Sequence, residues 1–332
     1  MFFFVIALPG RFGMWCDAIA AGLAARALGP SEIIGANSLE ELSSSALRLQ
    51  ALRAVVASRH GGGRLRRALI DASRKFIVAF EDPRVACAEL ARSGQSDLPH
   101  AVKQVASGAA AVLAYRTAPG ALALQAETDW LDPLHTAHAI AEHLDLAVSQ
   151  HDVAEIVAEV DAAGLRQEQG EAEAWWRALD EPERAIVEGA LAAYLGGHDE
   201  STPMSIVWAG GLFLIGDRFD QGAARPIDIT GRARCLLHGP YVMLPPGTWS
   251  TVLSLQFSRE AAEHDFLVEV VTDRQLASTT IRPHHGGQLD ADLTFVIDDS
   301  SDSPVSIRLS TQRAAFDGLV MLNEARLSQH PV

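Results

Sequence analysis

The sequence predicts two domains, an α/β domain with a parallel sheet and then an antiparallel β-sandwich or jelly roll. The length of 332 residues fits about two domains at the usual size of roughly 150 residues each. In the first half, continuous apolar runs alternate with segments of helical periodicity, which is typical of a parallel sheet. From about residue 204 the apolar runs become short and alternate with polar residues, which is typical of a sandwich. We expect a first domain at residues 1–168, a connecting helix and linker at 169–203, and the sandwich at 204–332.

The first predicted strand covers residues 2–8 and ends at Pro9 and Gly10, and a helix is expected over residues 15–27. A strand, a glycine-bearing turn and a helix form the layout of a loop that holds a phosphate with backbone N–H groups. Gly10 and Gly13 would let the backbone approach the phosphate, and Arg11 would add a positive charge. The Walker pattern is absent, because neither Lys-Ser nor Lys-Thr follows Gly13. An ordinary turn without a ligand explains these glycines about as well.

The remaining elements of the first half follow in alternation. Strands are expected at residues 33–35, 76–80 and 121–125, and a polar cap at Ser38 predicts a helix towards residue 57. Further helices are expected from residue 85, over 99–115 and from residue 132. The Gly-rich basic stretch 60–67 is typical of a solvated helix start rather than of an anion site. An acidic helical segment over 170–194 precedes a Gly-rich and polar boundary at 196–203.

Three segments resemble motifs of the sulfotransferase family of P-loop folds, and together they cover about residues 1–165. Residues 9–15 (PGRFGMW) resemble its first loop, P-[KR]-S-G-T-[TS]-W. Residues 81–85 (EDPRV) resemble its second motif, R-D-P-R-D with a Ser four residues later, and residues 131–133 (LDP) resemble its late L-x-x-D-P segment. The resemblance implies a site for 3′-phosphoadenosine 5′-phosphosulfate, with Glu81, Arg84 and Glu89 in the second motif.

The departures from the family pattern fall on the groups that would hold this donor. Aligning Arg11 with the basic residue of the first loop puts Phe12 and Met14 where the family has hydroxyls. On the 3′-phosphate side the family's Arg aligns with Glu81 and its Ser with Glu89. A charge-assisted bond to phosphate contributes about 1.5–3 kcal/mol, and each carboxylate facing the anion adds repulsion. We therefore expect no donor cofactor and no confident catalytic residue, unless Arg84, Arg74 or Lys75 substitutes.

Composition limits the partners and the compartment. The net charge of −15, from 27 basic and 42 acidic residues, argues against nucleic acid or an anionic membrane as the main partner. Cys16, Cys87 and Cys235 fit neither a zinc pattern nor a disulfide framework, so we interpret them as buried thiols in a reducing compartment. No basic region precedes the apolar start, and no run approaches the ~20 apolar residues of a membrane span. We expect a cytoplasmic protein without a resident metal.

The second half is expected to contain ten short strands. They are placed at residues 205–209, 212–215, 233–237, 241–244, 249–257, 266–272, 275–281, 293–297, 305–309 and 319–327. Residues 239–249, 305–309 and 316–320 resemble carbohydrate-binding β-sandwich modules, which are appended to bacterial enzymes of surface-polysaccharide synthesis. Such modules use flat aromatic rings with polar groups beside them. The candidates for glycan binding are Trp208, Asp217, Arg218, Trp249, His284, His285 and Asp317, although the two tryptophans fit a core position better.

Three functions remain open at this point. The first is a non-catalytic or weakly active accessory protein of bacterial exopolysaccharide or cell-surface glycan synthesis, whose partner is a glycan or a polysaccharide-assembly protein. The second is a working sulfotransferase with an atypical donor site that acts on a carbohydrate. The third is a structural assembly module. The negative net charge favours neutral sugars over sulfated or uronic ones, because like charges repel. The lost donor-binding groups favour the first or the third.

Overall fold

The computed structural model describes residues 1–94, 96–160, 162–195, 203–216, 218–298 and 301–330. The chain divides into two compact units, Met1–Leu179 with 300–302 and Asp180–Asp299 with 303–332. The segment 169–203, predicted as a connection, is shared between them: helix α9 (Ala162–Ala178) belongs to the first unit and helix α10 (Glu181–Leu191) to the second. Both predicted architectures, a parallel α/β sheet and an antiparallel sandwich, are confirmed.

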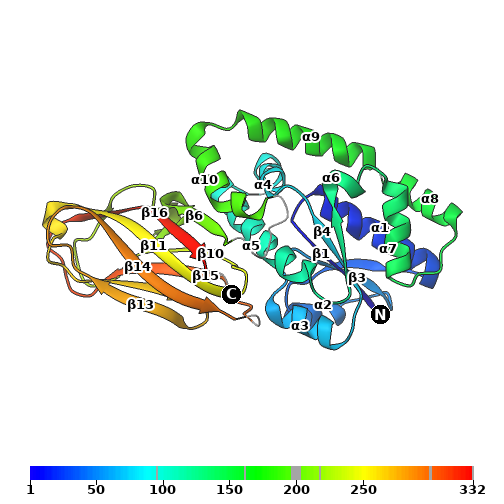
Figure 1. Ribbon diagram of the computed structural model, residues 1–332, viewed down its shortest axis with the longest axis horizontal. Helices are drawn as coiled ribbons and strands as arrows, with labels where there is room; N and C mark the ends of the chain where they lie inside the picture. Colours follow the sequence, from blue (N-terminus) through cyan, green and yellow to red (C-terminus); the bar gives the residue numbers. More distant parts are fainter. Residues whose placement is uncertain (95, 161, 196–202, 217, 299–300, 331–332) are drawn as a thin grey trace. The chain divides into compact units, whose positions relative to one another are not determined.

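The first unit is built on a parallel sheet of five strands in the order β2-β3-β1-β4-β5 (Figure 1). The central strand β1 pairs with β3 on one side and with β4 on the other. Its residues are almost fully buried on both faces, as its uninterrupted apolar sequence requires. The strands are β1 (Phe2–Ala7), β2 (Glu32–Gly35), β3 (Ala54–Ser58), β4 (Phe76–Phe80) and β5 (Ala121–Gln125).

The sequence interpretation missed strand β3 and was wrong about the helix towards residue 57. Helix α2 (Leu39–Ala46) begins at the predicted cap, where the Ser38 side chain accepts from the Glu41 N–H, but it ends at Ala46. The next apolar run, Ala54–Ser58, pairs with β1 and β2 and is nearly all buried. A five-residue run rich in alanine carries no periodicity that separates a buried strand from a helix.

Helices cover both faces of this sheet (Figure 1). Helix α1 lies on one face, where Phe12, Trp15 and Ile19 pack with Val5 and Trp130 in one buried cluster. Helix α5 lies on the other face, and its Tyr115 ring packs edge-on against Phe76. The helices of this unit besides α2 and α9 are α1 (Arg11–Leu28), α3 (Gly63–Asp71), α4 (Pro83–Arg92), α5 (Leu98–Arg116), α6 (Ala126–Asp129), α7 (Pro133–His143) and α8 (Gln150–Glu159).

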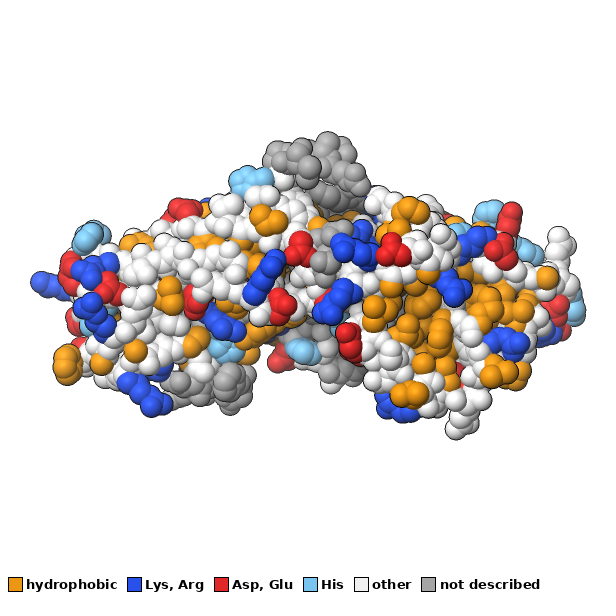
Figure 2. All heavy atoms as spheres, turned by 90° about the horizontal axis from the view of Figure 1, so that it is seen from below, with side chains coloured by type: hydrophobic (Ala, Val, Ile, Leu, Met, Phe, Trp, Pro, Cys, Tyr) orange, Lys and Arg blue, Asp and Glu red, His pale blue; other side chains and the backbone are white. Residues whose placement is uncertain are grey.

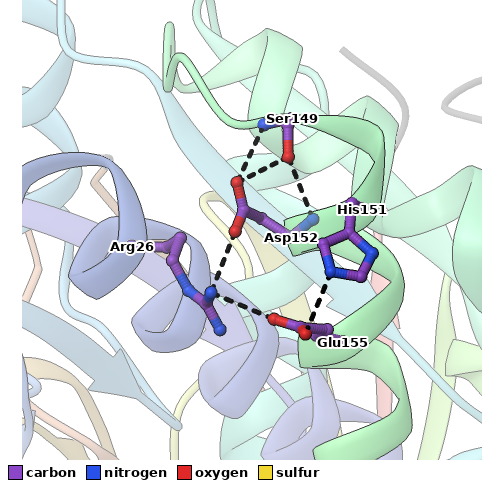
Figure 3. Close-up of polar contacts among 5 residues, drawn as sticks. All are labelled: Arg26, Ser149, His151, Asp152 and Glu155. Atoms are coloured by element: carbon purple, nitrogen blue, oxygen red, sulfur yellow. Dashed lines mark hydrogen bonds and ion pairs between the residues drawn. The ribbon is translucent and has the colours of Figure 1, made fainter.

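A polar network ties helix α8 to the end of α1 (Figure 3). Arg26 donates to Asp152 at 2.9 Å and to Glu155 at 3.0 Å. Asp152 also completes a capping box with Ser149 at the start of α8, and His151 pairs with Glu155. These groups are solvent-accessible, so the network orients α8 rather than supplying much stability.

The second unit is a sandwich of two antiparallel sheets. One sheet has the order β13-β12-β15-β10-β7-β8, and the other has the order β14-β11-β16-β6, with β9 pairing to β16. Apolar side chains alternate inward along the strands, as in β14. The strands are β6 (Ser205–Ala209), β7 (Leu214–Ile215), β8 (Arg218–Gly222), β9 (Ile227–Asp228), β10 (Cys235–Val242), β11 (Gly247–Phe257), β12 (Phe266–Val271), β13 (Gln275–Ile281), β14 (Gly287–Ile297), β15 (Val305–Thr311) and β16 (Leu319–Gln329).

Two features of the sandwich differ from the prediction. The segments predicted as separate strands at 233–237 and 241–244 form one strand, β10, which stays paired with β15 through Gly239 and Pro240. Strands β8 and β9 were missed, because β8 carries a polar sequence and β9 has only two residues. A Gly-Pro pair is normally a turn signal, so the sequence favoured a break that the pairing with β15 overrides.

Two expectations from composition can be compared with the fold. All three cysteines are free, and Cys16 and Cys87 are buried as expected, whereas Cys235 is half-buried. Within the described residues, none of the helices combines the length and the apolar character that crossing a bilayer requires.

We expect limited proteolysis to cut first between residues 196 and 203, where glycines and polar residues gather in the sequence. Helix α10 packs on strand β6, and its Val187 and Leu191 are buried. The two fragments should therefore remain associated on size exclusion after the cut and separate only in denaturant. A first cut outside residues 196–203 would contradict this prediction.

Candidate functional site

The candidate phosphate loop joins β1 to α1, as the sequence predicted. Gly10 caps α1, and its N–H donates to the Leu8 carbonyl at 2.9 Å. A side chain at position 13 would overlap the loop, because a β-carbon there would lie 2.7 Å from the Ala7 side chain. Gly13 thus allows the first turn of α1 to pack directly on the end of β1. Phe12, at the family's hydroxyl position, is fully buried and stacks with Trp15.

Glu81 occupies the place where this loop would hold an anion. It follows β4 directly, it is only 1% exposed, and its carboxyl lies so close to Gly10 that a β-carbon there would overlap it. Its neighbours include the backbone N–H groups of Phe12 and Gly13, which belong to the first turn of α1. These amides and the helix dipole are what attract an anion to a helix N-terminus. The sequence alignment put Glu81 on the 3′-phosphate side, whereas the structure puts it at the first loop.

Burial controls the charge of the Glu81 carboxyl. Desolvation and the nearby Glu89 raise its pKa to about 8, against the opposing pull of the Phe12 and Gly13 amides and of Arg59. Among the described residues, neither carboxyl oxygen has a hydrogen-bond partner in normal geometry, so the amides act on it without a full bond. At pH 7 this carboxyl is therefore predominantly protonated. An uncharged side chain thus fills the anion cradle, by which we mean the space beside Gly10 and the N–H groups of Phe12 and Gly13.

Arg11, the candidate cation of the loop, is engaged by two carboxylates. It forms ion pairs with Glu89 on α4 and with Glu168 on α9, the latter at 2.8 Å, and its side chain is 22% exposed. Burial raises the pKa of Glu89 while the Arg11 guanidinium lowers it. The sequence predicted that Arg11 would attract a donor phosphate and Glu89 would repel it. Instead the two side chains neutralise each other.

A second buried ion pair lies beside the loop. Asp17 on α1 pairs with Arg59, which follows β3. Burial raises the pKa of Asp17 to about 6, although the Arg59 charge and hydrogen bond pull it down. Sequence reasoning missed this pair and Glu168. One signal was available, because Asp17 lies one turn beyond Gly13, whereas Arg59 follows β3, the strand that the sequence interpretation missed.

The space left at the loop is small. A cavity of about 190 Å³ is lined by Gly10, Arg11, Arg59 and Glu89, with Pro9, Met14, Leu90 and Ser93. Ligand pockets usually measure about 300–1,000 Å³, so this volume is below the range for a nucleotide. Arg84, the basic residue of the second motif, binds the Asp82 carboxylate, with Nη2 to Oδ2 at 2.6 Å. Arg11 and Arg84 thus each face a carboxylate of the protein itself.

The candidate glycan-binding residues of the sandwich differ in their exposure to solvent. Trp208 and Trp249 are fully buried, and Trp249 donates its indole N–H to the Pro245 carbonyl at 3.0 Å. This corrects the idea that either one is a sugar platform, because neither ring presents a face to solvent. Asp317 is exposed, and its carboxylate accepts from the Gly318 N–H at 2.7 Å.

The other sandwich candidates are on loops or outside the description. His284 is 80% exposed and contacts Glu263 at 3.2 Å, and His285 contacts the carbonyl of Gly286. Asp217 lies outside the described residues, and Arg218 is the first residue of β8. Within the described part of the chain, no three His, Cys, Asp or Glu side chains are grouped so as to hold a metal ion.

The distribution of surface charge is mixed. On the face drawn in Figure 2, Lys and Arg side chains are interspersed with Asp and Glu side chains rather than forming one continuous basic surface. This face lacks the concentrated positive field that phosphate backbones require.

Comparisons with known proteins give likenesses of fold only. No family model matches the chain, and no curated protein matches it. Mouse sulfotransferase SULT7A1, solved with PAP, is 11% identical over 48% of this chain and 62% of its own length, with a TM-score of 0.37. TmCBM61, solved with β-1,4-galactotriose, is 11% identical over 38% of this chain and 88% of its own length (TM-score 0.25). The xylan-binding module CBM15 is 11% identical over 31% and 76%, with a TM-score of 0.25.

Proposed function

We propose that this protein is a non-catalytic accessory protein of bacterial exopolysaccharide or cell-surface glycan synthesis, acting in the cytoplasm. The observation that carries the non-catalytic part is the Glu81 carboxyl in the anion cradle of α1, against Gly10. A donor would have to displace a buried side chain and also compete with Glu89 and Glu168 for Arg11. The sulfotransferase-like unit then serves as a scaffold, and recognition of a glycan or an assembly partner falls to the sandwich.

The sandwich supports the second part of the proposal through its exposed loops. Asp317 and His285 stand on loops between strands, and both side chains offer polar atoms to a ligand. Phe316, next to Asp317, is 97% exposed, so it gives this loop the apolar ring that the buried tryptophans do not supply. The negative net charge favours neutral sugars.

A transfer assay separates this proposal from a working sulfotransferase. The full chain is incubated with 3′-phosphoadenosine 5′-phosphosulfate and a mixture of neutral oligosaccharides, and products are analysed by mass spectrometry. We expect no mass increase corresponding to a sulfate, because the donor cradle is filled. Sulfated product that disappears in an Arg11→Ala variant would establish the sulfotransferase function instead.

A glycan array with the full chain tests the binding part. We expect signals from neutral glycans that fall in Phe316→Ala and Asp317→Ala variants, while Asp273→Ala, an exposed hairpin control, keeps them. Silence on the array would leave a structural assembly role as the remaining function.

A further inference from the structure

A second cavity in the first unit is larger than the cavity at the loop. It measures about 550 Å³ and lies at the carboxyl ends of β4 and β5, under helix α9. Its lining residues are Asp82, Arg84, Val85, Ala126, Glu127, Trp130, Leu131, Arg166, Gln169, Glu173, Trp176 and Arg177. The volume is within the range of ligand pockets, and the carboxyl ends of parallel strands are where open α/β sheets bind their ligands.

The side of α9 that faces this cavity is polar. Arg166, Gln169, Glu173 and Arg177 are spaced by three or four residues, so they share one face of the helix, together with Trp176. A helix that only covers a sheet turns an apolar stripe towards it. Here Ala172 and the two tryptophans at 175 and 176 pack with Val85 and Ala88 of α4, while the polar side chains line a hollow.

The charges that line the cavity balance, and most of these groups have a partner within the protein. Arg84 binds Asp82, and Arg177 binds Glu173 at 3.2 Å. Arg166 donates to the Trp130 carbonyl at 3.2 Å. Three arginines and three carboxylates, those of Asp82, Glu127 and Glu173, leave no net charge to attract an ionic ligand. An arginine beside a carboxylate offers hydrogen-bond donors and acceptors side by side. A sugar hydroxyl can use both, because it donates and accepts.

We propose that this cavity binds a neutral saccharide unit of one to three residues, with Trp176 as its apolar wall and Glu127 and Gln169 as hydrogen-bonding partners of the sugar hydroxyls. The proposal rests on the proposed function, because it adds to the sandwich a second glycan contact in the first unit. Trp176 stands at the edge of the cavity with the Arg84 guanidinium 5.9 Å from its ring centroid, so the wall combines an aromatic ring with a polar neighbour.

Calorimetric titration of the full chain with neutral mono- to trisaccharides of hexoses, pentoses and N-acetylhexosamines tests the site. We expect a dissociation constant in the micromolar to millimolar range for at least one of them. Glu127→Ala should weaken this binding about tenfold, and Gln169→Ala about fivefold, since each removes a hydrogen-bonding partner. Gln167→Ala is the matched control, because Gln167 is exposed on the same helix and does not line the cavity.

Each outcome decides the proposal. Weakening by Glu127→Ala and Gln169→Ala but not by Gln167→Ala supports it. Unchanged affinity in these variants, with loss in Asp317→Ala, overturns it and leaves the proposed function intact. Absence of binding by every saccharide in the set overturns it too, and array signals from longer glycans would then show that the proposed function survives. Binding of adenosine 3′,5′-bisphosphate that is weakened by Gln169→Ala would assign the cavity to a nucleotide instead.

Discussion

Replacing Glu81 with Gln should remove most of the loss of stability that the protein suffers between pH 5 and pH 8. The folded pKa of this carboxyl is about 8, against an ordinary value of 4.5. Below pH 4.5 it is protonated in both the folded and the unfolded chain. Between the two values the unfolded chain releases the proton and the folded chain keeps it, so the free energy of unfolding falls by about 1.4 kcal/mol per pH unit. Over the whole window this loss is of the order of 4–5 kcal/mol.

Urea denaturation at pH 5.5, 7.0 and 8.5 measures this effect as the difference between variant and wild type. Glutamine mimics the protonated side chain, so the Glu81→Gln variant should become progressively more stable than wild type as the pH rises. Below about pH 6, Asp17 also makes the free energy of unfolding fall as the pH rises, but Asp17 is present in both proteins. The charged groups Arg59 and Glu89 act on Glu81 and remain in the variant. Glu127→Gln, an exposed change in the same unit, is the control. If the free energies of unfolding of Glu81→Gln and wild type changed in parallel with pH, this would contradict a buried protonated carboxyl.

Truncating Trp208 should destabilise the sandwich strongly without removing any ligand contact. The side chain is fully buried on β6, and Trp→Ala changes in cores cost about 3–5 kcal/mol. Trp208→Phe should cost less than Trp249→Phe, because the Trp208 indole N–H has no described hydrogen-bond partner whereas that of Trp249 donates to Pro245. Thermal unfolding, followed by circular dichroism, measures which of these substitutions destabilises the protein most.

The exposed residue Phe316 supplies the matched control for this series. Phe316→Ala should change the free energy of unfolding by no more than about 0.5 kcal/mol, as surface substitutions usually do. Equal effects of Trp208→Ala and Phe316→Ala would mean that Trp208 is not a core residue.

Periodicity in the sequence predicted most of the fold, and the errors at β3 and β10 share one cause. Strands β1, β4 and β5 stand out because each apolar run is bounded by turn residues. Helix α7 begins at the expected Pro133 after its Asp132 cap, and α5 begins at Leu98, one residue before the expected Pro99. Strand β3 was missed because five mostly small residues have no distinctive pattern, and its assignment depends on pairing with β1. The unbroken β10 depends in the same way on pairing with β15. Long-range pairing overrides local signals at these positions.

The candidate site was predictable in its residues but not in their contacts. The sequence singled out Gly10, Arg11, Glu81 and Glu89, and all four meet at one loop. An alignment to a motif assigns Glu81 to the position of an arginine, but it does not tell where a shorter acidic side chain will point. The Glu81 carboxyl turns towards Gly10, while Glu89 and Glu168 hold Arg11 in ion pairs. Glu168 comes from a helix 157 residues further along the chain, and no local pattern links it to Arg11.

Titration calorimetry with adenosine 3′,5′-bisphosphate at pH 7 tests most directly whether Glu81 closes the donor cradle. We expect no measurable binding by the wild type at submillimolar ligand. Glu81→Arg combined with Glu89→Ser should bind more tightly, because the pair of changes opens the cradle, releases Arg11 and adds a cation. Glu159→Gln, an exposed change at the end of α8 that lines neither the loop nor the cavity under α9, should behave as wild type. A micromolar dissociation constant for the wild type, unimproved by the double substitution, would contradict a closed cradle and identify the first unit as a nucleotide-binding enzyme domain.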